Sequence, residues 1–261
     1  MNILSLFDGI SCGQVAINRL GINYDNYYAS EIDKFALAVT KKNYPNTIQL
    51  GDIRNVNGKG LPKIDLLMGG SPCQSFSNAG NKSGFDGKSG LFWEYVRIKN
   101  EVNPTYFLLE NVSMRPEWMD IITTEMGVEP ITINSSLVSA QNRKRVYWTN
   151  IPNVTIPEDK NIHLKEIVGE YDGIWVYPRG FNKGGVQSYN GKSPTVTISS
   201  WQHNFMIYKN DEKRKFTPNE VEQLQNLPID YTDCISDNQR YKTIGNGWTV
   251  NVITHILKNI K

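Results

Sequence analysis

The chain has 261 residues, of which 39% are hydrophobic and 21% are charged, so it can bury a full core as one large domain or as a large and a small one. Its net charge of +2 is only mildly basic, which does not exclude a nucleic-acid partner. The three cysteines are far apart and only three histidines accompany them, which excludes a disulfide framework and a zinc site. No apolar run is long enough to span a membrane, and the N-terminus lacks a secretory-signal pattern, so we expect a cytoplasmic protein.

The first 150 residues alternate short apolar runs with amphipathic segments. The runs predict strands at 2–7, 24–31, 65–70, 105–112 and 129–138. The segments between them predict helices at 14–21, 34–45, 91–102 and 116–127. Strands that alternate with helices indicate an α/β fold with a parallel sheet covered on both faces. In such a sheet, ligands bind beyond the carboxyl ends of the strands.

The sequence changes character after Trp148. Residues 151–200 are rich in Pro, Gly, Asn and Lys, which predicts a small, loop-rich subdomain. A helix is predicted over 216–228, with Thr217 as its N-cap and Pro218 in its first turn, and the tail 249–261 predicts an amphipathic helix. We expect a large domain of residues 1–150 plus 238–261, and a small subdomain of residues 151–237.

The ends of the first strands carry residues suited to an adenosine. Phe7, Gly9 and Gly13 form a turn after the first strand, and Glu31 ends the second, where a carboxylate can accept from both ribose hydroxyls. Asp52, after the next segment, can accept from the adenine amino group. The turn lacks the strict GxGxxG spacing, which disfavours a pyrophosphate ligand.

A candidate nucleophile lies in the stretch GGSPCQSF at 69–76. Cys73 follows two glycines, a serine and a proline, unlike a buried structural cysteine. Backbone N–H groups of a turn and a nearby helix N-terminus would favour its reactive thiolate. Glu110 ends the most apolar strand, where a protonated carboxyl group can donate to a ring nitrogen. The alternatives are a structural cysteine and a carboxylate that caps the next helix.

Three polar residues alternate in the stretch QNRKRVYW. Gln141, Arg143 and Arg145 point the same way if the segment is extended. Two guanidinium groups beside a carboxylate and a thiolate would orient the acid and bind a substrate oxygen or phosphate. A basic strand edge that prevents aggregation is the alternative.

The order of these pieces resembles the DNA cytosine-5 methyltransferase family. FDGISCG, SE, GD, GGSPCQ, ENV, QNRKR, SPTVT and GNGWTVNV follow one another from residue 3 to about residue 258. Gly247-Trp248, FDGIS and the DYTD at 230–233 are closer to the vertebrate de novo branch, whereas Ser11-Cys12 stand where bacterial members carry Gly-Gly. The resemblance implies a Rossmann-like, S-adenosylmethionine-dependent methyltransferase sheet with a small target-recognition subdomain.

The resemblance also implies a role for each matching residue. Cys73 would attack carbon 6 of a cytosine flipped out of double-stranded DNA, and carbon 5 would then take the methyl group. Glu110 would contact the N3 edge of the base, Arg145 would hold Glu110, and Arg143 would bind the carbonyl oxygen or the phosphate. No metal is implied. S-adenosylmethionine would lie against Phe7, Asp8, Gly9, Ile10, Glu31, Ile32, Asp52, Ile53, Ser71, Pro72, Leu91, Asn246, Gly247 and Trp248.

DNA contacts are expected from two loops and from the flanking motifs. The glycine-bearing loop from Gln74 to Gly90 resembles a lid that closes on DNA, and 178–185 is the expected reading loop, with Arg179 bidentate to guanine. The recognition segment between QNRKR and SPTVT has only about 45–50 residues, which suggests a short target site or the help of a second subunit in a homodimer. The candidate DNA-binding residues are Gln74, Ser75, Lys82, Gln141, Arg179, Asn182, Lys183, Thr195 and Thr197.

Two other functions share this motif order. A tRNA cytosine-5 methyltransferase has the same catalytic motifs, but the Cys-Phe-Thr element typical of that branch is not found here. A catalytically dead regulatory paralogue usually loses the Cys or the ENV glutamate, and both are present. We therefore expect an active DNA-modifying enzyme, bacterial or encoded by a phage, of the kind found in restriction-modification systems.

Overall fold

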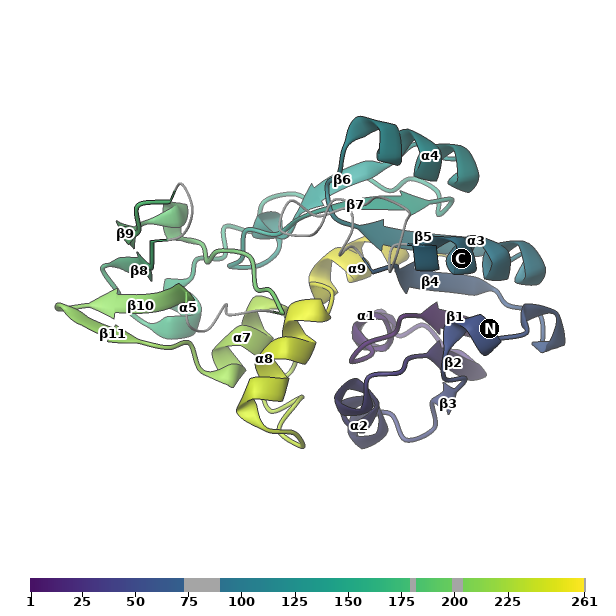
Figure 1. Cartoon of the computed structure of the whole chain (residues 1–261), viewed down its shortest axis with the longest axis horizontal. Coiled ribbons are helices and arrows are strands. Elements are labelled where there is room, and N and C mark those ends of the chain that lie inside the picture. The colour runs from purple at the N-terminus through teal and green to yellow at the C-terminus, as the bar shows by residue number, and fades with distance from the viewer. Residues whose placement is uncertain (73–89, 179–181, 199–203, 261) are drawn as a thin grey trace. The chain divides into compact units, whose positions relative to one another are not determined.

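The computed structural model describes residues 1–72, 90–178, 182–198 and 204–260 (Figure 1). It divides into two compact units. Unit 1 comprises Met1–Ile133, Lys144–Ile156 and Thr254–Lys261, and unit 2 comprises Asn134–Arg143 and Pro157–Ile253. This division differs from the expected one at residues 134–143 and 238–253, which belong to unit 2, and at residues 151–156, which belong to unit 1.

Unit 1 is built on a seven-stranded sheet with the strand order β3-β2-β1-β4-β5-β7-β6. Strand β1 pairs in parallel with both β2 and β4, β4 pairs in parallel with β5, and only then does β7 run antiparallel to β5. The predicted α/β sheet is confirmed, and the strand order reverses at β1 and β4, where such sheets bind ligands. The strands are β1 (Asn2–Leu6), β2 (Asn26–Ser30), β3 (Ile48–Gln49), β4 (Leu66–Gly70), β5 (Tyr106–Asn111), β6 (Ile131–Asn134) and β7 (Lys144–Thr149).

Helices cover this sheet on both faces. On one face, Leu67 and Leu109 of the strands share a buried core with Phe92 of α3 (Leu91–Val102) and Ile122 of α4 (Pro116–Met126). Side chains alternate along a strand, so the residue after Leu67 points to the other face, against α1 (Cys12–Arg19). The remaining helices with residues in unit 1 are α2 (Lys34–Asn43), the short 3-10 turns η1 (Ile53–Asn55) and η2 (Gly58–Gly60), and α9 (Val250–Leu257).

Gly13 of α1 is explained by this packing. A Cβ atom at Gly13 would lie 2.8 Å from the Cε atom of Met68 on β4 and 3.3 Å from the Tyr27 hydroxyl on β2. Helix and sheet thus approach closely at Gly13, and a larger residue there would require the flexible end of the Met68 side chain to shift.

Unit 2 contains an antiparallel sheet that the composition did not reveal. Its order is β11-β10-β8-β9, from β8 (Gly173–Val176), β9 (Gly185–Gln187), β10 (Phe205–Lys209) and β11 (Glu212–Arg214). Residues 151–200 are rich in loops as expected, but the strands at 173–176 and 185–187 were not predicted, because strands of three or four residues leave little periodicity. Its helices are α5 (Lys165–Val168), α7 (Pro218–Leu224) and α8 (Asp237–Asn246).

The predicted helix at 216–228 is confirmed as α7. Thr217 accepts from the backbone of Glu220, whose carboxylate accepts in return from the backbone N–H of Thr217, which completes a capping box.

Among the residues that the structure describes, no helix is long and apolar enough to cross a membrane.

Candidate active site

The turn after β1 holds a strained backbone. Phe7, Gly9 and Ser11 all adopt left-handed conformations, with φ of 56°, 57° and 57°. Glycine tolerates such a φ, whereas a bulky residue such as Phe adopts it rarely and at a cost. Strain of this kind persists only where surrounding contacts impose it, and it is concentrated at functional sites.

Glu31 joins this turn to the end of β2. Its carboxylate accepts from the backbone N–H of Gly9 at 2.8 Å, of Ile32 at 2.6 Å and of Asp33 at 2.7 Å. A carboxylate offers about four lone-pair sites, so Glu31 retains the capacity to accept from a hydroxyl. Its predicted contact with a ribose stays a prediction, and its contact with the turn was not foreseen.

Asp8 fixes the turn from within the protein. Its carboxylate accepts from the Tyr27 hydroxyl at 2.9 Å and from the Ser11 hydroxyl. Burial raises the pKa of Asp8 to about 6, although hydrogen bonds from Ser11, Ser5 and Tyr27 oppose the rise. The side chain thus holds the shape of the turn, and any contribution of Asp8 to ligand binding comes through its backbone.

The ends of β2 and β3 carry an apolar surface beside an ionised acceptor. Ile32 is 69% exposed, which is unusual for isoleucine. Asp52 accepts from the backbone N–H and the guanidinium of Arg54, and these hydrogen bonds hold the pKa of Asp52 down to about 2. An apolar surface with one placed acceptor suits an adenine ring and its amino group. Ile53 and Ile10 are buried, and their predicted contacts with the cofactor stay predictions.

The ends of β4 and β5 lie side by side. Gly70 is the register partner of Glu110, and Asn111 donates to the Ser71 hydroxyl at 3.0 Å. Ser71 is buried and Pro72 is partly buried. Cys73 comes directly after them in sequence and, with Gln74, Ser75 and Lys82, lies outside the described residues.

Glu110 and Arg145 form an ion pair across β5 and β7. Arg145 Nε lies 3.0 Å from Glu110 Oε1, and the side chains are only 16% and 11% exposed. The contact that the sequence predicts between these two residues is therefore present. A guanidinium held against a carboxyl group orients it, but the catalytic roles of both residues stay predictions.

Arg143 is bonded within unit 2. It is 4% exposed, and its guanidinium donates to the carbonyl oxygens of Val196 at 2.7 Å, Gly247 at 2.9 Å and Gly245 at 3.2 Å. These donors are buried and engaged within unit 2, which favours a structural role, and the predicted contact with a cytosine or a phosphate stays a prediction. Arg143 fastens the backbone of the GNGW turn.

Gln141 is also buried completely. Its Nε2 donates to the Leu224 carbonyl at 3.1 Å and its Oε1 accepts from the Val196 N–H at 2.8 Å. A direct DNA contact of Gln141 is thus not supported by the structure. The alternation in QNRKR did not predict these directions, because the chain passes from unit 2 to unit 1 between Arg143 and Lys144.

Gln225 is a further support of the GNGW turn that the sequence did not mark. Its Nε2 donates to the carbonyls of Ile244 and Gly247, both at 3.1 Å, and its Oε1 accepts from Thr249 at 2.7 Å. Asn246 is exposed and Trp248 partly buried. Together with Gly247, they stay predicted contributors to the cofactor site.

The candidate DNA-contacting residues of unit 2 differ in exposure. Asn182 and Lys183 are exposed, and Asn182 Oδ1 accepts from the Gly184 N–H at 2.9 Å. Thr197 is exposed, whereas Thr195 is partly buried and donates to the Asn142 carbonyl at 2.6 Å. Arg179 lies outside the described residues.

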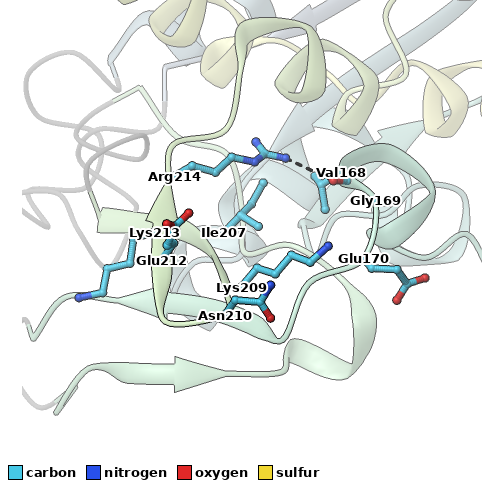
Figure 2. Close-up of a pocket in the computed structure, with 9 residues that line it drawn as sticks. All are labelled: Val168, Gly169, Glu170, Ile207, Lys209, Asn210, Glu212, Lys213 and Arg214. Carbon is cyan, nitrogen blue, oxygen red and sulfur yellow. Dashed lines mark hydrogen bonds between the residues drawn. The ribbon is translucent and has the colours of Figure 1, made fainter.

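A pocket of about 470 Å³ in unit 2 is separate from all of these residues (Figure 2). It lies between the end of α5 and the β10–β11 hairpin, and Arg214 crosses it to donate to the Val168 carbonyl at 3.3 Å. Arg214 is already paired with Glu220, so its charge is compensated. The lining residues are Val168, Gly169, Glu170, Ile207, Lys209, Asn210, Glu212, Lys213 and Arg214.

Comparison with known proteins places the chain in a family. The family model for C-5 cytosine-specific DNA methylases matches residues 1–171 and 175–261. The chain is 30% identical over 302 residues to the Type II methyltransferase M1.ScrFI of Lactococcus lactis subsp. cremoris, covering 99% of this chain and 77% of that protein. It is 31% identical over 309 residues to the Type II methyltransferase M.SsoII of Shigella sonnei, covering 99% and 79%.

Solved structures share the fold at lower identity. A putative DNA modification methyltransferase encoded within an E. coli prophage superposes with a TM-score of 0.74 at 19% identity, covering 100% of this chain and 98% of that one. The Entamoeba histolytica methyltransferase EhMeth gives a TM-score of 0.74 at 16% identity, covering 100% and 99%. With the family model matching nearly the whole chain, the protein belongs to the C-5 cytosine-specific DNA methylases and is a DNA cytosine-5 methyltransferase.

Proposed function

We propose that this enzyme methylates carbon 5 of a cytosine flipped out of double-stranded DNA, through a covalent adduct with Cys73. The observation that carries the proposal is the position of Glu110. It ends β5 beside Gly70, the last residue of the strand that leads to Cys73, and it is held by Arg145. An acid and a nucleophile at the same edge of one sheet can act on one base.

The first turn and its neighbours fit S-adenosylmethionine, whose sulfonium supplies an electrophilic methyl group. The strained turn at Phe7 and Gly9 would receive the cofactor, and Glu31 has acceptor capacity left for the ribose hydroxyls. The ionised Asp52 and the exposed Ile32 would contact the adenine. Leu91, which begins α3 and packs partly buried on the core, would contribute apolar contact.

The chain's own residues supply the remaining chemistry. The Cys73 thiolate forms a bond to carbon 6, and the electron pair of the 5,6 double bond moves toward the ring nitrogen N3. Glu110 donates a proton or hydrogen bond to N3, which offsets this charge, and Arg145 keeps the carboxyl group in place. Carbon 5 then takes the methyl group. A base from the solvent then takes the carbon-5 proton, the 5,6 double bond forms again as Cys73 leaves as a thiolate, and the proton on N3 returns to Glu110.

Unit 2 would select the target. Its small antiparallel sheet carries the reading loop between β8 and β9, where Asn182 and Lys183 are exposed. Arg179 would bond a guanine, and Thr195 and Thr197 would contact the backbone. So small a recognition surface favours a short site, or a homodimer in which a second subunit adds contacts. Because the relatives M1.ScrFI and M.SsoII are type II methyltransferases, we propose that this enzyme also modifies DNA at a defined sequence.

The acceptor and the nucleophile can be tested together. Purified protein is incubated with tritiated S-adenosylmethionine and either duplex DNA or tRNA, and label is expected in DNA. Cys73→Ser should abolish transfer but still bind S-adenosylmethionine, whereas Cys234→Ser, at an exposed cysteine of unit 2, serves as the matched control with full activity. Label in tRNA alone, or an active Cys73→Ser variant, would overturn the proposal.

A further inference from the structure

Residues 51–60 form a loop that carries the predicted adenine contacts but contains no strand. It holds only the two 3-10 turns η1 and η2. At its start, Ser30 Oγ donates to the Gly51 carbonyl at 2.7 Å. Farther along, Ile53 and Val56 bury their side chains in the core. Its backbone between these points is held by one face of α3.

That face consists of Glu94, Arg97 and Glu101, which we call the α3 clamp. Residues spaced by three and four lie on one side of a helix. Arg97 Nε lies 2.9 Å from Glu94 Oε2, and its NH1 lies 2.9 Å from Glu101 Oε1. The two carboxylates thus fix the plane and the direction of the guanidinium.

The guanidinium of Arg97 also donates hydrogen bonds to the loop. NH2 donates to the Ile53 carbonyl and NH1 to the Val56 carbonyl, both at 3.0 Å. Ile53 is the first residue of the η1 turn and Val56 is its C-cap, and the N-cap of the same turn is Asp52. One planar group therefore sets the orientation of the turn that carries the predicted adenine acceptor.

Glu101 closes the clamp on the second half of the loop. Its Oε2 accepts from the Gly58 N–H at 2.8 Å. A Cβ atom at Gly58 would lie 2.8 Å from Glu101 Cβ, so only glycine lets the loop approach the helix this closely.

We propose that Arg97 is a positioning residue for adenine recognition. It holds η1 so that the Asp52 carboxylate faces the adenine amino group, and it does so through two carbonyls that a lysine could not reach at once. The inference rests on the proposed function, because it takes Asp52 as the adenine acceptor. Arg97 itself touches neither ligand nor base.

The test compares two ligands that differ only at the 6-position of the base, which Asp52 would contact, and in the proton that the neighbouring N1 carries in the 6-oxo base. S-adenosylhomocysteine has an amino group there, and S-inosylhomocysteine has a carbonyl oxygen. Calorimetry on the wild-type protein should show tighter binding of the adenosine compound by about tenfold, since a mismatched polar group forfeits about 1.4 kcal/mol. Arg97→Lys should weaken the binding of S-adenosylhomocysteine and bring the affinities for the two ligands within about twofold of each other.

Two further variants make the outcome decisive. Arg115→Lys is the matched control and should keep the wild-type ratio. Arg115 is the exposed N-cap residue of α4, and it makes a long ion pair with Glu117 and a cation–π contact with Trp118. Glu94→Gln removes the ion pair that orients Arg97 but leaves both carbonyl contacts, so it should lower the ratio of the two affinities by less than Arg97→Lys does. If Arg97→Lys does not fold, the ratio measured with Glu94→Gln decides the test.

A general loss of stability would lower both affinities and leave their ratio intact, so an unchanged ratio in Arg97→Lys overturns the proposal. A wild-type protein that binds both ligands equally also overturns it, because Asp52 would not read the amino group. In either case, continued methylation of DNA by the wild type would leave the proposed function standing. A wild type that binds neither ligand would instead sink the proposed function.

Discussion

Replacing Arg143 by alanine separates a structural role from a role at the substrate. The side chain is 4% exposed and donates to three carbonyls of unit 2. A hydrogen bond from a charged group contributes about 1.5–3 kcal/mol. The three bonds share one side chain and are not additive, and large single-site losses rarely exceed about 4–5 kcal/mol. We therefore expect Arg143→Ala to lower the free energy of unfolding by about 4 kcal/mol.

The loss should appear as a fall in melting temperature of roughly 8–16 °C, at about 2–4 °C per kcal/mol for a chain of this size. Urea unfolding measures the free energy, and single-turnover methylation at a temperature where the variant is folded measures the chemistry. Arg145→Ala is the matched comparison, because its partner is Glu110, and it should lose more rate than stability. An Arg143→Ala variant that keeps its melting temperature but loses methylation activity would support the substrate contact that the sequence predicts. It would refute the structural role.

Three further changes follow from other contacts. Asp8 keeps its proton up to a pH of about 6 in the folded state but releases it near its ordinary pKa of 3.8 when unfolded, so stability falls as pH rises through this window, by up to about 3 kcal/mol. In urea unfolding, the free energy of unfolding of Asp8→Asn should therefore rise relative to that of the wild type between pH 4 and pH 7. A difference between the two free energies that does not change with pH would contradict this. Gly245→Ala places a Cβ atom 2.5 Å from the Thr197 carbonyl and should destabilise by about 1–3 kcal/mol, whereas an unchanged urea midpoint would speak against that packing. Glu110→Gln should slow single-turnover methylation by about 10²–10⁴-fold while leaving S-adenosylmethionine affinity unchanged, and a normal rate would remove Glu110 from the chemistry.

The sheet of unit 1 could be predicted because its signal is local. Apolar runs such as 65–70 and 105–112 are followed by amphipathic helices, and each became a strand in the expected place. Unit 2 could not be predicted in the same way. Strands such as β9 and β11 have three residues each, which is too short for a periodic pattern of apolar and polar residues to stand out.

The site shows the same contrast between local and distant contacts. The expectation that Arg145 holds Glu110 came from the family resemblance, and the structure shows the ion pair on two adjoining strands of the sheet. Arg143, two residues earlier, bonds to carbonyls at 196, 245 and 247, and no spacing within QNRKR indicates those partners. Likewise, Arg97 resembles any helical arginine with acidic neighbours until the loop at 51–60 is seen to lie against it.

Analysis of the modified nucleosides tests the central claim most directly. Duplex DNA treated with the wild-type enzyme and S-adenosylmethionine is digested to nucleosides, and the products are identified by mass spectrometry against standards. We expect 5-methylcytosine as the product with the wild type and with Cys234→Ser, and none with Cys73→Ser. Methylation at an exocyclic nitrogen of cytosine or adenine, or 5-methylcytosine made by Cys73→Ser, would contradict the account.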